Sequence, residues 1–388
     1  MLNMFSSCFT GYDSQTVSYN QEKEEPLSAS QLLKRLKAAH SNEQRMALID
    51  NFFAAHSPED FPIVEDTTCY FFFRGKGAQA VVGDFNQWNP QADPFISVSN
   101  TDLFYVVKHF PLNARLDYKL IVDGKWILDP FNSRTVWGGF GPNSELMMPQ
   151  YQFPSEIKPR AGIQQGKVIA WSFRSAVLNN TRQIWVYLPW TYARYPRKRF
   201  PVLYVQDGGE YIRLANMITI LNKLIAQQRI EPIITVFINP VDRQNEYWFN
   251  PDYVKMLKEE LIPAVDSTWR TLSHPQHRGI MGASLGGTMS FFIALNHQLF
   301  AKVASQSGAL GIANKRIFSL FQQTRIPPLT IYLDWGMFEK GQREVHQKFQ
   351  KLLEQQGHTV FVKEHPEGHS WGNWRAHIDD ILITFWGK

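Results

Sequence analysis

The chain contains 388 residues, of which 44% are hydrophobic and 12 are tryptophan, so it is too long for one ordinary domain and too apolar to be disordered. The net charge of +5 is modest, and the basic residues are scattered apart from the run 194–199, which we interpret as a solvated loop. We therefore expect no nucleic-acid partner. Two cysteines cannot build a disulfide framework, and no apolar stretch is long enough to span a membrane, so we expect no membrane partner.

Residues 1–60 are predicted to form an amino-terminal arm followed by a helical segment. Residues 1–27 are polar and irregular, and the first ten residues lack the basic flank and long apolar core of a signal peptide. We therefore expect the protein to act in the cytoplasm. From Leu27 to His56, apolar residues recur at helical spacing, which predicts a helical hairpin.

Residues 61–150 are predicted to form a small antiparallel, immunoglobulin-like β-sandwich. Short runs rich in aromatic and β-branched residues alternate there with turn signals such as Asn89-Pro90 and Asp123-Gly124. The expected strands cover residues 69–73, 78–82, 103–108, 116–122 and 126–128. Residues 151–166 carry several prolines and glycines and are predicted to be a linker.

Residues 167–388 show strand-like and helix-like runs in alternation, which predicts an α/β domain with a doubly wound sheet covered by helices. Two of the expected helices cover residues 251–269 and 343–356. In such a sheet the active-site groups lie on loops at the carboxyl ends of the strands.

The sequence Gly282-Ala-Ser284-Leu-Gly286 matches the Gly-x-Ser-x-Gly pattern of a nucleophile elbow. An apolar strand-like run precedes it and an apolar helical run follows it, which is the context that this motif needs. Glycines are required on either side because a Cβ atom there would collide with the neighbouring strand or helix. Ser284 is therefore the candidate nucleophile.

A serine needs a base to take its proton, and the base needs an acid to orient it. His369 follows the last expected strand in a glycine-flanked loop, which fits the base. Asp334 and Glu339 both follow the strand at residues 329–333, and either could be the acid. The turn expected at Gly336 favours Glu339.

The oxyanion hole needs two backbone N–H groups. One is expected from Leu285, directly after the nucleophile, and the other from Gly209 or Glu210 in the loop Asp207-Gly-Gly-Glu210. We also place Asp207 among the substrate-binding candidates because it stands at the end of its strand.

The loop at residues 239–250 follows a central strand and should border the same pocket. Arg243 could hold a polar or anionic part of the substrate, and Glu246 could brace Arg243. Trp248 and Phe249 could supply a wall for a ring. The alternative is a structural Arg–Glu pair at the surface.

These motifs together resemble the esterase D family, and most closely the enterochelin (enterobactin) esterases, over roughly residues 165–388. The resemblance rests on five segments: Gly-Ala-Ser284-Leu-Gly-Gly, Asp207-Gly-Gly, Asp242-Arg243-x-x-Glu246, Asp334-x-Gly336-x-x-Glu339 and Gly368-His369. It implies a serine hydrolase of the α/β-hydrolase fold without a metal or other cofactor, and it implies that Arg243 lies beside the substrate. The same superfamily includes feruloyl and acetyl-xylan esterases, so the scaffold indicates the reaction better than the substrate.

The predicted sandwich has a resemblance of its own. Gly83-Asp-Phe-Asn-Gln-Trp88 and the stretch 117–130 look like the glycogen-binding modules of branching enzymes. In those modules the residues that match Trp88, Lys119 and Trp126 contact sugar. Modules of this kind joined to esterases also serve as structural partners or as part of the active-site wall.

We therefore expect a serine ester hydrolase whose substrate is a siderophore-type or aryl ester, ferric siderophores included. A feruloyl or acetyl esterase acting on polysaccharide-linked esters is the alternative within the class. A carbohydrate-binding protein with a non-catalytic hydrolase scaffold is the alternative from another class, and it predicts that catalytic groups are missing. The sequence does not indicate the oligomeric state.

Overall fold

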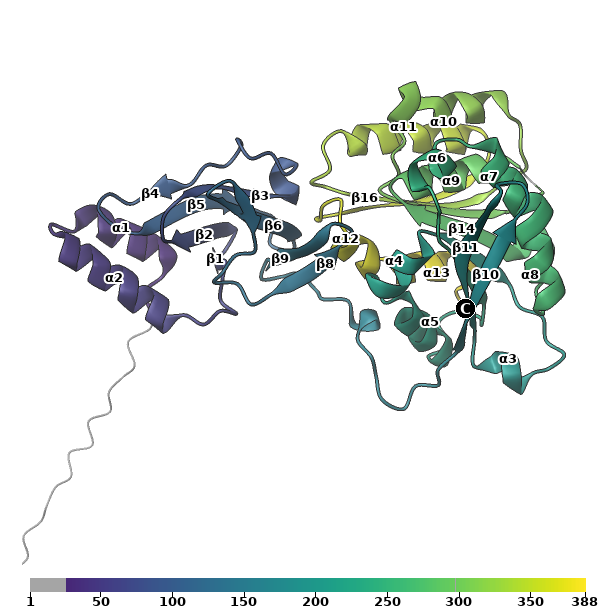
Figure 1. Cartoon of the computed structure of the whole chain (residues 1–388), viewed down its shortest axis with the longest axis horizontal. Coiled ribbons are helices and arrows are strands. Elements are labelled where there is room, and N and C mark those ends of the chain that lie inside the picture. The colour runs from purple at the N-terminus through teal and green to yellow at the C-terminus, as the bar shows by residue number, and fades with distance from the viewer. Residues whose placement is uncertain (1–25, 297) are drawn as a thin grey trace, which may run out of the picture. The chain divides into compact units, whose positions relative to one another are not determined.

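The computed structural model describes residues 26–296 and 298–388, and the chain forms two compact units, residues 1–56 and 57–388 (Figure 1). Nearly all of the predicted amino-terminal arm falls outside the described residues. No helix within the described ranges is both long and apolar enough to cross a membrane.

The first unit contains two helices, α1 (Ala29–Ala38) and α2 (Asn42–Ala55). Ser28 begins α1, because its hydroxyl accepts a hydrogen bond from the Gln31 N–H at 3.2 Å while the Gln31 side chain accepts one from the Ser28 N–H at 3.1 Å. Ser41 caps α2 through the Gln44 N–H. These caps satisfy N–H groups that the first turn of a helix leaves without a partner.

The second unit begins with a β-sandwich of two antiparallel sheets. One sheet has the order β1 (Ile63–Glu65), β2 (Thr68–Arg74), β5 (Leu103–His109), β4 (Ile96–Ser97). The other has the order β3 (Ala78–Gly83), β6 (Arg115–Val122), β9 (Gly141–Met147), β8 (Thr135–Gly138), and β7 (Lys125–Ile127) pairs with β6. Side chains from both sheets, among them Phe71 and Tyr118, form the core between them.

An eight-stranded sheet follows, in the order β10-β11-β13-β12-β14-β15-β16-β17. Its strands are β10 (Lys167–Ser175), β11 (Asn180–Leu188), β12 (Val202–Gln206), β13 (Ile234–Ile238), β14 (Arg278–Ala283), β15 (Lys302–Gln306), β16 (Thr330–Gly336) and β17 (Thr359–His365). Every neighbouring pair from β13 to β17 is parallel, whereas β10 and β11 join antiparallel. The carboxyl ends of the parallel strands therefore meet at one edge.

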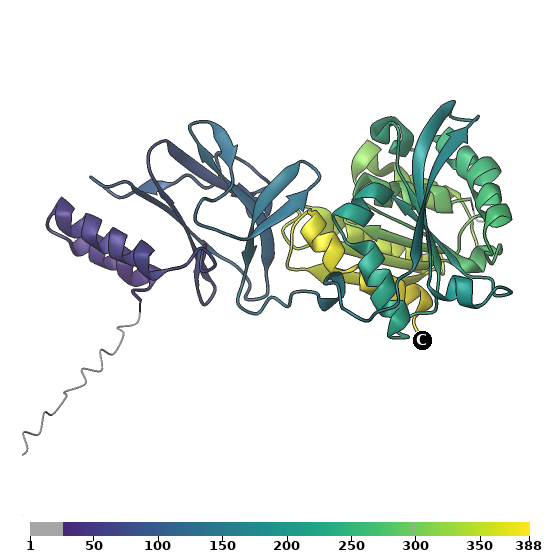
Figure 2. The same ribbon diagram turned by 60° about the horizontal axis from the view of Figure 1, so that its bottom comes forward.

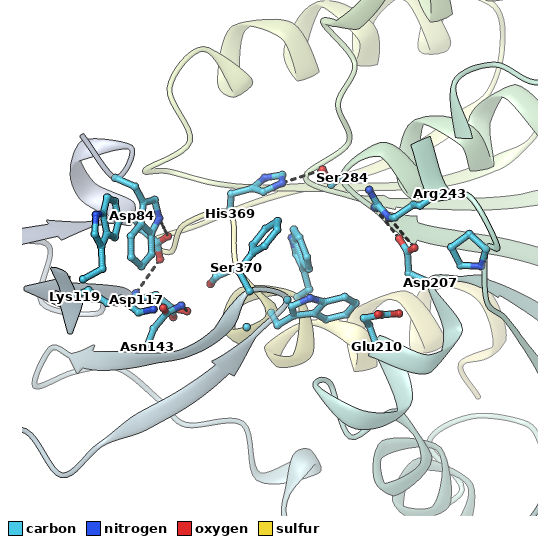
Figure 3. A pocket seen from close by; sticks show the side chains of 18 of the residues that line it. Asp84, Asp117, Lys119, Asn143, Asp207, Glu210, Arg243, Ser284, His369 and Ser370 are labelled. Atoms are coloured by element: carbon cyan, nitrogen blue, oxygen red, sulfur yellow. Dashed lines mark hydrogen bonds and ion pairs between the residues drawn. The ribbon is translucent and has the colours of Figure 1, made fainter. Parts of the chain in front are cut away.

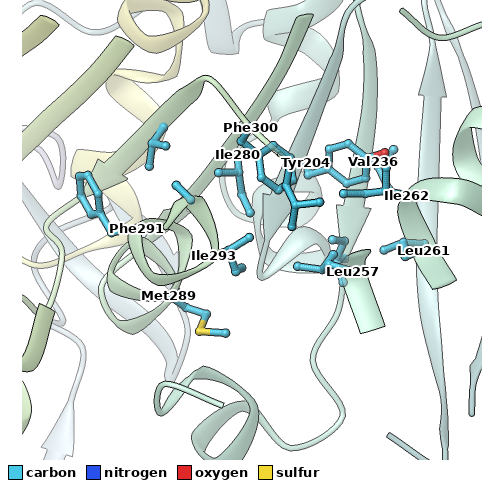
Figure 4. Packing of buried hydrophobic residues seen from close by; sticks show 14 of the residues in the cluster. Tyr204, Val236, Leu257, Leu261, Ile262, Ile280, Met289, Phe291, Ile293 and Phe300 are labelled. Carbon is cyan, nitrogen blue, oxygen red and sulfur yellow. The ribbon is translucent and has the colours of Figure 1, made fainter. Parts of the chain in front are cut away.

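Helices cover both faces of this sheet (Figures 1 and 2). Along β13, Val236 belongs to one hydrophobic cluster and Phe237 to another, as expected when successive side chains point to opposite faces. The helices are α3 (Thr191–Arg194), α4 (Gly208–Arg213), α5 (Met217–Ala226), α6 (Arg243–Tyr247), α7 (Pro251–Met256), α8 (Ile262–Thr268), α9 (Leu285–Ala294), α10 (Ile312–Gln323), α11 (Gln342–Gln355), α12 (Trp371–Ala376) and α13 (Ile378–Trp386). Figure 4 shows Met289, Phe291 and Ile293 of α9 within the first cluster.

This architecture confirms the predicted fold class, an α/β-hydrolase sheet preceded by a β-sandwich and a helical segment. Two local predictions differ from the structure. The helix expected over residues 251–269 is interrupted by a π-helical turn, Leu257–Leu261. The β8–β9 hairpin was not predicted from the sequence. It lies beside α12 in both views (Figures 1 and 2).

Candidate active site

Ser284 stands between β14 and α9 on a strained turn, with φ 54° and ψ −124°. A Cβ atom on Gly282 would lie 2.5 Å from the carbonyl carbon of Gly286, so the strand and the helix approach too closely for any side chain there. The Ser284 N–H donates to the Gln306 carbonyl at 2.8 Å. These features are those of a nucleophile elbow, which exposes the serine hydroxyl at the carboxyl edge of the sheet.

His369 and Glu339 complete a hydrogen-bonded triad with this serine. His369 Nε2 lies 3.0 Å from Ser284 Oγ, and His369 Nδ1 lies 2.7 Å from Glu339 Oε2. The other oxygen of Glu339 accepts hydrogen bonds from the Gly336 N–H and the Ser307 hydroxyl. Burial raises the pKa of Glu339, but the interactions with His369, Ser307 and Gly336 outweigh it, and the net pKa lies below the usual value. Glu339 is therefore held as a carboxylate.

Asp334, the other acid candidate, is fully buried in β16 and does not contact His369. Its Oδ2 accepts a hydrogen bond from Gln306 Nε2 at 3.2 Å. Burial raises its pKa to about 7. The structure thus gives the position beside the histidine to Glu339, because the chain turns at Gly336 and returns toward the loop of His369.

The two expected oxyanion donors differ in whether their N–H groups already have an acceptor. The Leu285 N–H opens α9 and has no acceptor within the described part of the chain. The Gly209 N–H, in contrast, donates to Asn239 Oδ1 at 2.8 Å, so Gly209 is not the free donor that we expected. The Glu210 N–H donates to the Asp207 carbonyl at 3.0 Å. Among the described residues, Gly208 retains the N–H without an acceptor in this loop.

Arg243 is held by Asp207 in a bidentate ion pair, Nε–Oδ1 and Nη2–Oδ2 both at 2.8 Å. The prediction that Glu246 braces Arg243 was wrong, because Glu246 pairs with the buried Arg182 of β11 at 3.0 Å through both oxygens. The Asp207 N–H donates to the Tyr247 hydroxyl at 3.0 Å. The guanidinium of Arg243 is fixed but remains partly exposed.

A cavity of about 900 Å³ opens over Ser284 and His369 (Figure 3). The α/β domain contributes Ser284 and His369 with Asp207, Glu210, Asn239, Pro240, Val241, Arg243, Ser370, Trp371 and Trp374. The sandwich contributes Asp84, Trp88, Asp117, Lys119, Trp126, Gly138, Gly139, Phe140 and Asn143. The predicted sugar-contact residues Trp88, Lys119 and Trp126 thus lie on the wall of the catalytic cavity. The rings of Trp88 and Trp126 stack at 6.1 Å with an interplanar angle of 14°.

The expected aromatic wall after β13 is absent from this lining. Trp248 is half-exposed and does not line the cavity, and Phe249 is buried against Phe292. Trp371 and Trp374 of α12 take that place, packed edge to face at 4.9 Å. Sequence reasoning missed both, although they follow His369 directly and could have been found from that position. It also missed Phe140, at the tip of the unpredicted hairpin, whose glycine-rich sequence was the available signal.

A serine, histidine and glutamate in this geometry on this fold define a serine hydrolase that cleaves carboxylic esters. Residues 175–385 match a family described as "Putative esterase", and the chain belongs to that family. The alternative of a carbohydrate-binding protein with a non-catalytic hydrolase scaffold predicted that catalytic groups are missing, and the complete triad contradicts that prediction.

Two curated relatives illustrate the likeness. The iron(III) enterobactin esterase of Escherichia coli O6:H1 is 24% identical over 333 residues, which cover 80% of this chain and 82% of that protein. The uncharacterised protein YbbA of Bacillus subtilis is 31% identical over 150 residues, and the match covers 34% of this chain and 59% of that protein. The resemblance to enterochelin esterases is thereby confirmed.

Solved structures show the same fold. The enterobactin esterase from Shigella flexneri has a TM-score of 0.70 at 21% identity, covering 82% of this chain and 92% of that one. A ferulic acid esterase has a TM-score of 0.52 at 19% identity, covering 57% of this chain and 98% of that one.

Proposed function

We propose that this esterase hydrolyses catechol-type siderophore esters through an acyl-enzyme. The observation that carries the proposal is the shared cavity, which is lined by Ser284 and His369 from the α/β domain and by the stacked rings of Trp88 and Trp126 from the sandwich. The flat apolar faces of these tryptophans suit the face of an aromatic ring. A volume of about 900 Å³ accommodates a substrate much larger than an acetyl ester.

The reaction follows from the geometry. Ser284 Oγ attacks the ester carbonyl while His369 Nε2 takes its proton, and the Leu285 N–H stabilises the oxyanion. The alcohol then leaves with the proton from His369. Water attacks the acyl-enzyme with His369 again as the base, and the free acid departs as Ser284 recovers its proton. Glu339 keeps the imidazolium oriented and charge-balanced in both steps.

The charges of the cavity are compatible with an acyl group that carries phenolate oxygens. Arg243 is already neutralised by Asp207, whereas no ion pair to Lys119 occurs among the described residues. Lys119 therefore offers a positive charge on the sandwich wall of the cavity. The likeness to the enterobactin esterase of E. coli supports a siderophore ester as the substrate. The match extends over 333 residues, which is longer than the α/β domain at residues 167–388, so it includes part of the sandwich as well.

A feruloyl or acetyl esterase acting on polysaccharide-linked esters is the second candidate. It is favoured by the fold shared with a ferulic acid esterase and by the sugar-module motifs around Trp88, Lys119 and Trp126. In this reading the sandwich wall would hold the sugar that bears the ester.

The test is hydrolysis of enterobactin, ferric enterobactin, ethyl ferulate, acetylated xylan and p-nitrophenyl acetate by the wild type and by Ser284→Ala. We expect the wild type to cleave enterobactin with the highest kcat/KM and Ser284→Ala to be inactive on all five. A preference for ethyl ferulate or acetylated xylan would move the assignment to the second candidate. Hydrolysis that persists in Ser284→Ala would contradict the mechanism itself.

A further inference from the structure

The loop that carries His369 runs from Pro366 to the start of α12, and the sandwich holds it at both ends. The N–H of Arg115 in β6 donates to the Pro366 carbonyl at 3.2 Å. The guanidinium of the same residue donates from Nη1 to Ser370 Oγ at 3.2 Å. One sandwich residue therefore contacts the chain on each side of the catalytic histidine.

Arg115 is itself fixed by neighbours on the sandwich. It is fully buried, and its guanidinium forms ion pairs with Asp117 Oδ1 at 2.6 Å and with Glu145 Oε1 at 2.6 Å. Its Nε donates to Glu145 at 2.7 Å as well. Glu145 Oε1 also forms an ion pair with Nη2 of Arg375 in α12 at 3.3 Å. A buried network of charges therefore joins the sandwich to the helix that follows the loop.

Gly368 of the loop and Gly372 of α12 mark where the sandwich packs against this segment. A Cβ atom on Gly368 would lie 2.2 Å from Asp84 Cγ, and one on Gly372 would lie 1.8 Å from Arg115 Nη1. Asp84 is buried, and its Oδ2 accepts the Asp117 N–H at 2.9 Å. Neither contact leaves room for a side chain, so Asp84 and Arg115 fix the backbone immediately before and soon after His369.

We propose that Arg115 and Asp84 are positioning residues for His369, which makes the sandwich part of the catalytic centre. The histidine needs such support, because its own side chain is 43% exposed and is otherwise held by Glu339 and by an edge-to-face contact with Trp374 at 5.0 Å. A shift of about 1 Å at a catalytic base can cost on the order of 10²-fold in rate.

A purely structural role for this network makes a different prediction. If Arg115 only joins the two domains, its replacement lowers thermal stability but leaves the turnover of the folded enzyme intact. If it positions His369, the folded variant loses kcat while KM changes little, since the cavity walls remain.

The experiment uses the full chain with Arg115→Lys, which keeps a cation between Asp117 and Glu145 but removes the planar fork that reaches Ser370. Turnover of p-nitrophenyl acetate is measured beside the rate at which diisopropyl fluorophosphate labels Ser284, a reaction that depends on the histidine base. We expect both rates to fall by about 10- to 100-fold. The matched control is Arg278→Lys, a buried arginine paired with Asp266 at the opposite end of β14 from Ser284. It should lower the melting temperature and leave both rates unchanged.

Should Arg115→Lys fail to fold, Ser370→Ala removes the hydroxyl that accepts a hydrogen bond from the guanidinium and another, at 3.4 Å, from the Asn373 N–H in the first turn of α12. Ser370→Thr restores both acceptors. We expect Ser370→Ala to lower the labelling rate by about 3- to 10-fold and Ser370→Thr to recover most of it. Unchanged turnover and labelling in a folded Arg115→Lys or in Ser370→Ala would overturn the proposal. The inference rests on ester hydrolysis by Ser284 and not on the acid that is released, so a different preferred substrate leaves it intact.

Discussion

Glu339 Oε2 and His369 Nδ1 lie 2.7 Å apart, and this bond settles which ring nitrogen can act as the base. A proton on Nδ1 leaves Nε2, 3.0 Å from Ser284 Oγ, free to accept the proton of the serine. The lowered pKa of Glu339, which its hydrogen bonds impose against the effect of burial, keeps it ionised throughout the cycle.

Replacement of this acid should therefore damage turnover far more than it damages binding. We expect Glu339→Gln to lower kcat for p-nitrophenyl acetate by about 10³- to 10⁴-fold, because an amide can stabilise the wrong tautomer and carries no charge. Asp334→Asn is the matched control: Asp334 is buried, its pKa is raised to about 7, and it does not touch His369. It should retain kcat within about tenfold. Equal losses in the two variants would show that Glu339 does not act as the orienting acid.

The triad could be predicted from the sequence because each member lies in the loop or turn that follows a strand of the parallel sheet. Strands of this kind end at a common edge, so Ser284, Glu339 and His369 converge whatever the details of packing. The partner of Arg243 could not be predicted in the same way. Glu246 lies three residues after Arg243 on the same short helix, but it forms an ion pair with the buried Arg182 of β11 instead. Only the tertiary structure shows that Arg182 is the nearer partner.

The close approach of β14 and α9 gives a stability prediction. Gly282→Ala should lower the free energy of unfolding by about 1–3 kcal/mol, because the new methyl group would lie 2.5 Å from the backbone of Gly286, which cannot move without displacing the nucleophile. Gly311→Ala is the control, since nothing lies within 4 Å of a Cβ atom there. Urea unfolding of the two variants beside the wild type measures the difference. An equally stable Gly282→Ala enzyme would mean that the elbow is less tightly packed than this geometry requires.

Asp84 should make stability depend on pH. Burial and the nearby carboxylate of Asp117 raise its pKa to about 8, although the Asp117 N–H, Arg115 and Trp88 Nε1 oppose the shift. Between its ordinary pKa of 3.8 and about 8, the folded protein binds a proton that the unfolded chain has released, so stability falls as the pH rises through this window.

Asp84→Asn replaces the titrating carboxyl group with an amide and should therefore reduce the pH dependence of stability. We expect the urea midpoint of the variant, minus that of the wild type, to increase steadily from pH 5 to pH 8. Altered hydrogen bonds can add a constant difference that does not depend on pH. Measurements at pH 5, 6.5 and 8 are sufficient. A difference that stays the same at all three values would show that Asp84 is ionised in the folded protein.

The resemblance left the sandwich as either a structural partner or part of the active-site wall, and sequence reasoning could not decide between the two for a physical reason. Local patterns predict strands and turns, and a resemblance can single out Trp88, Lys119 and Trp126, but neither reports which surface of one domain meets another. The contacts of Arg115 with the loop of His369 join residues far apart in the chain, and no periodicity encodes them.

The wall formed by Trp88 and Trp126 gives the most direct test of substrate class. Trp126→Ala removes one half of a stacked pair that lines the cavity, and an aromatic contact of this kind contributes about 0.5–1.5 kcal/mol beyond its buried area. We therefore expect KM for enterobactin to rise by about 3- to 10-fold, while kcat and the hydrolysis of p-nitrophenyl acetate stay the same. Trp137→Ala is the control, because Trp137 is exposed on the same sandwich and does not line the cavity. If Trp126→Ala instead leaves ester kinetics unchanged and abolishes retention on glycogen, the pair is a polysaccharide-binding surface, and the acyl group must be recognised by other residues of the cavity, such as Phe140, Trp371 and Trp374.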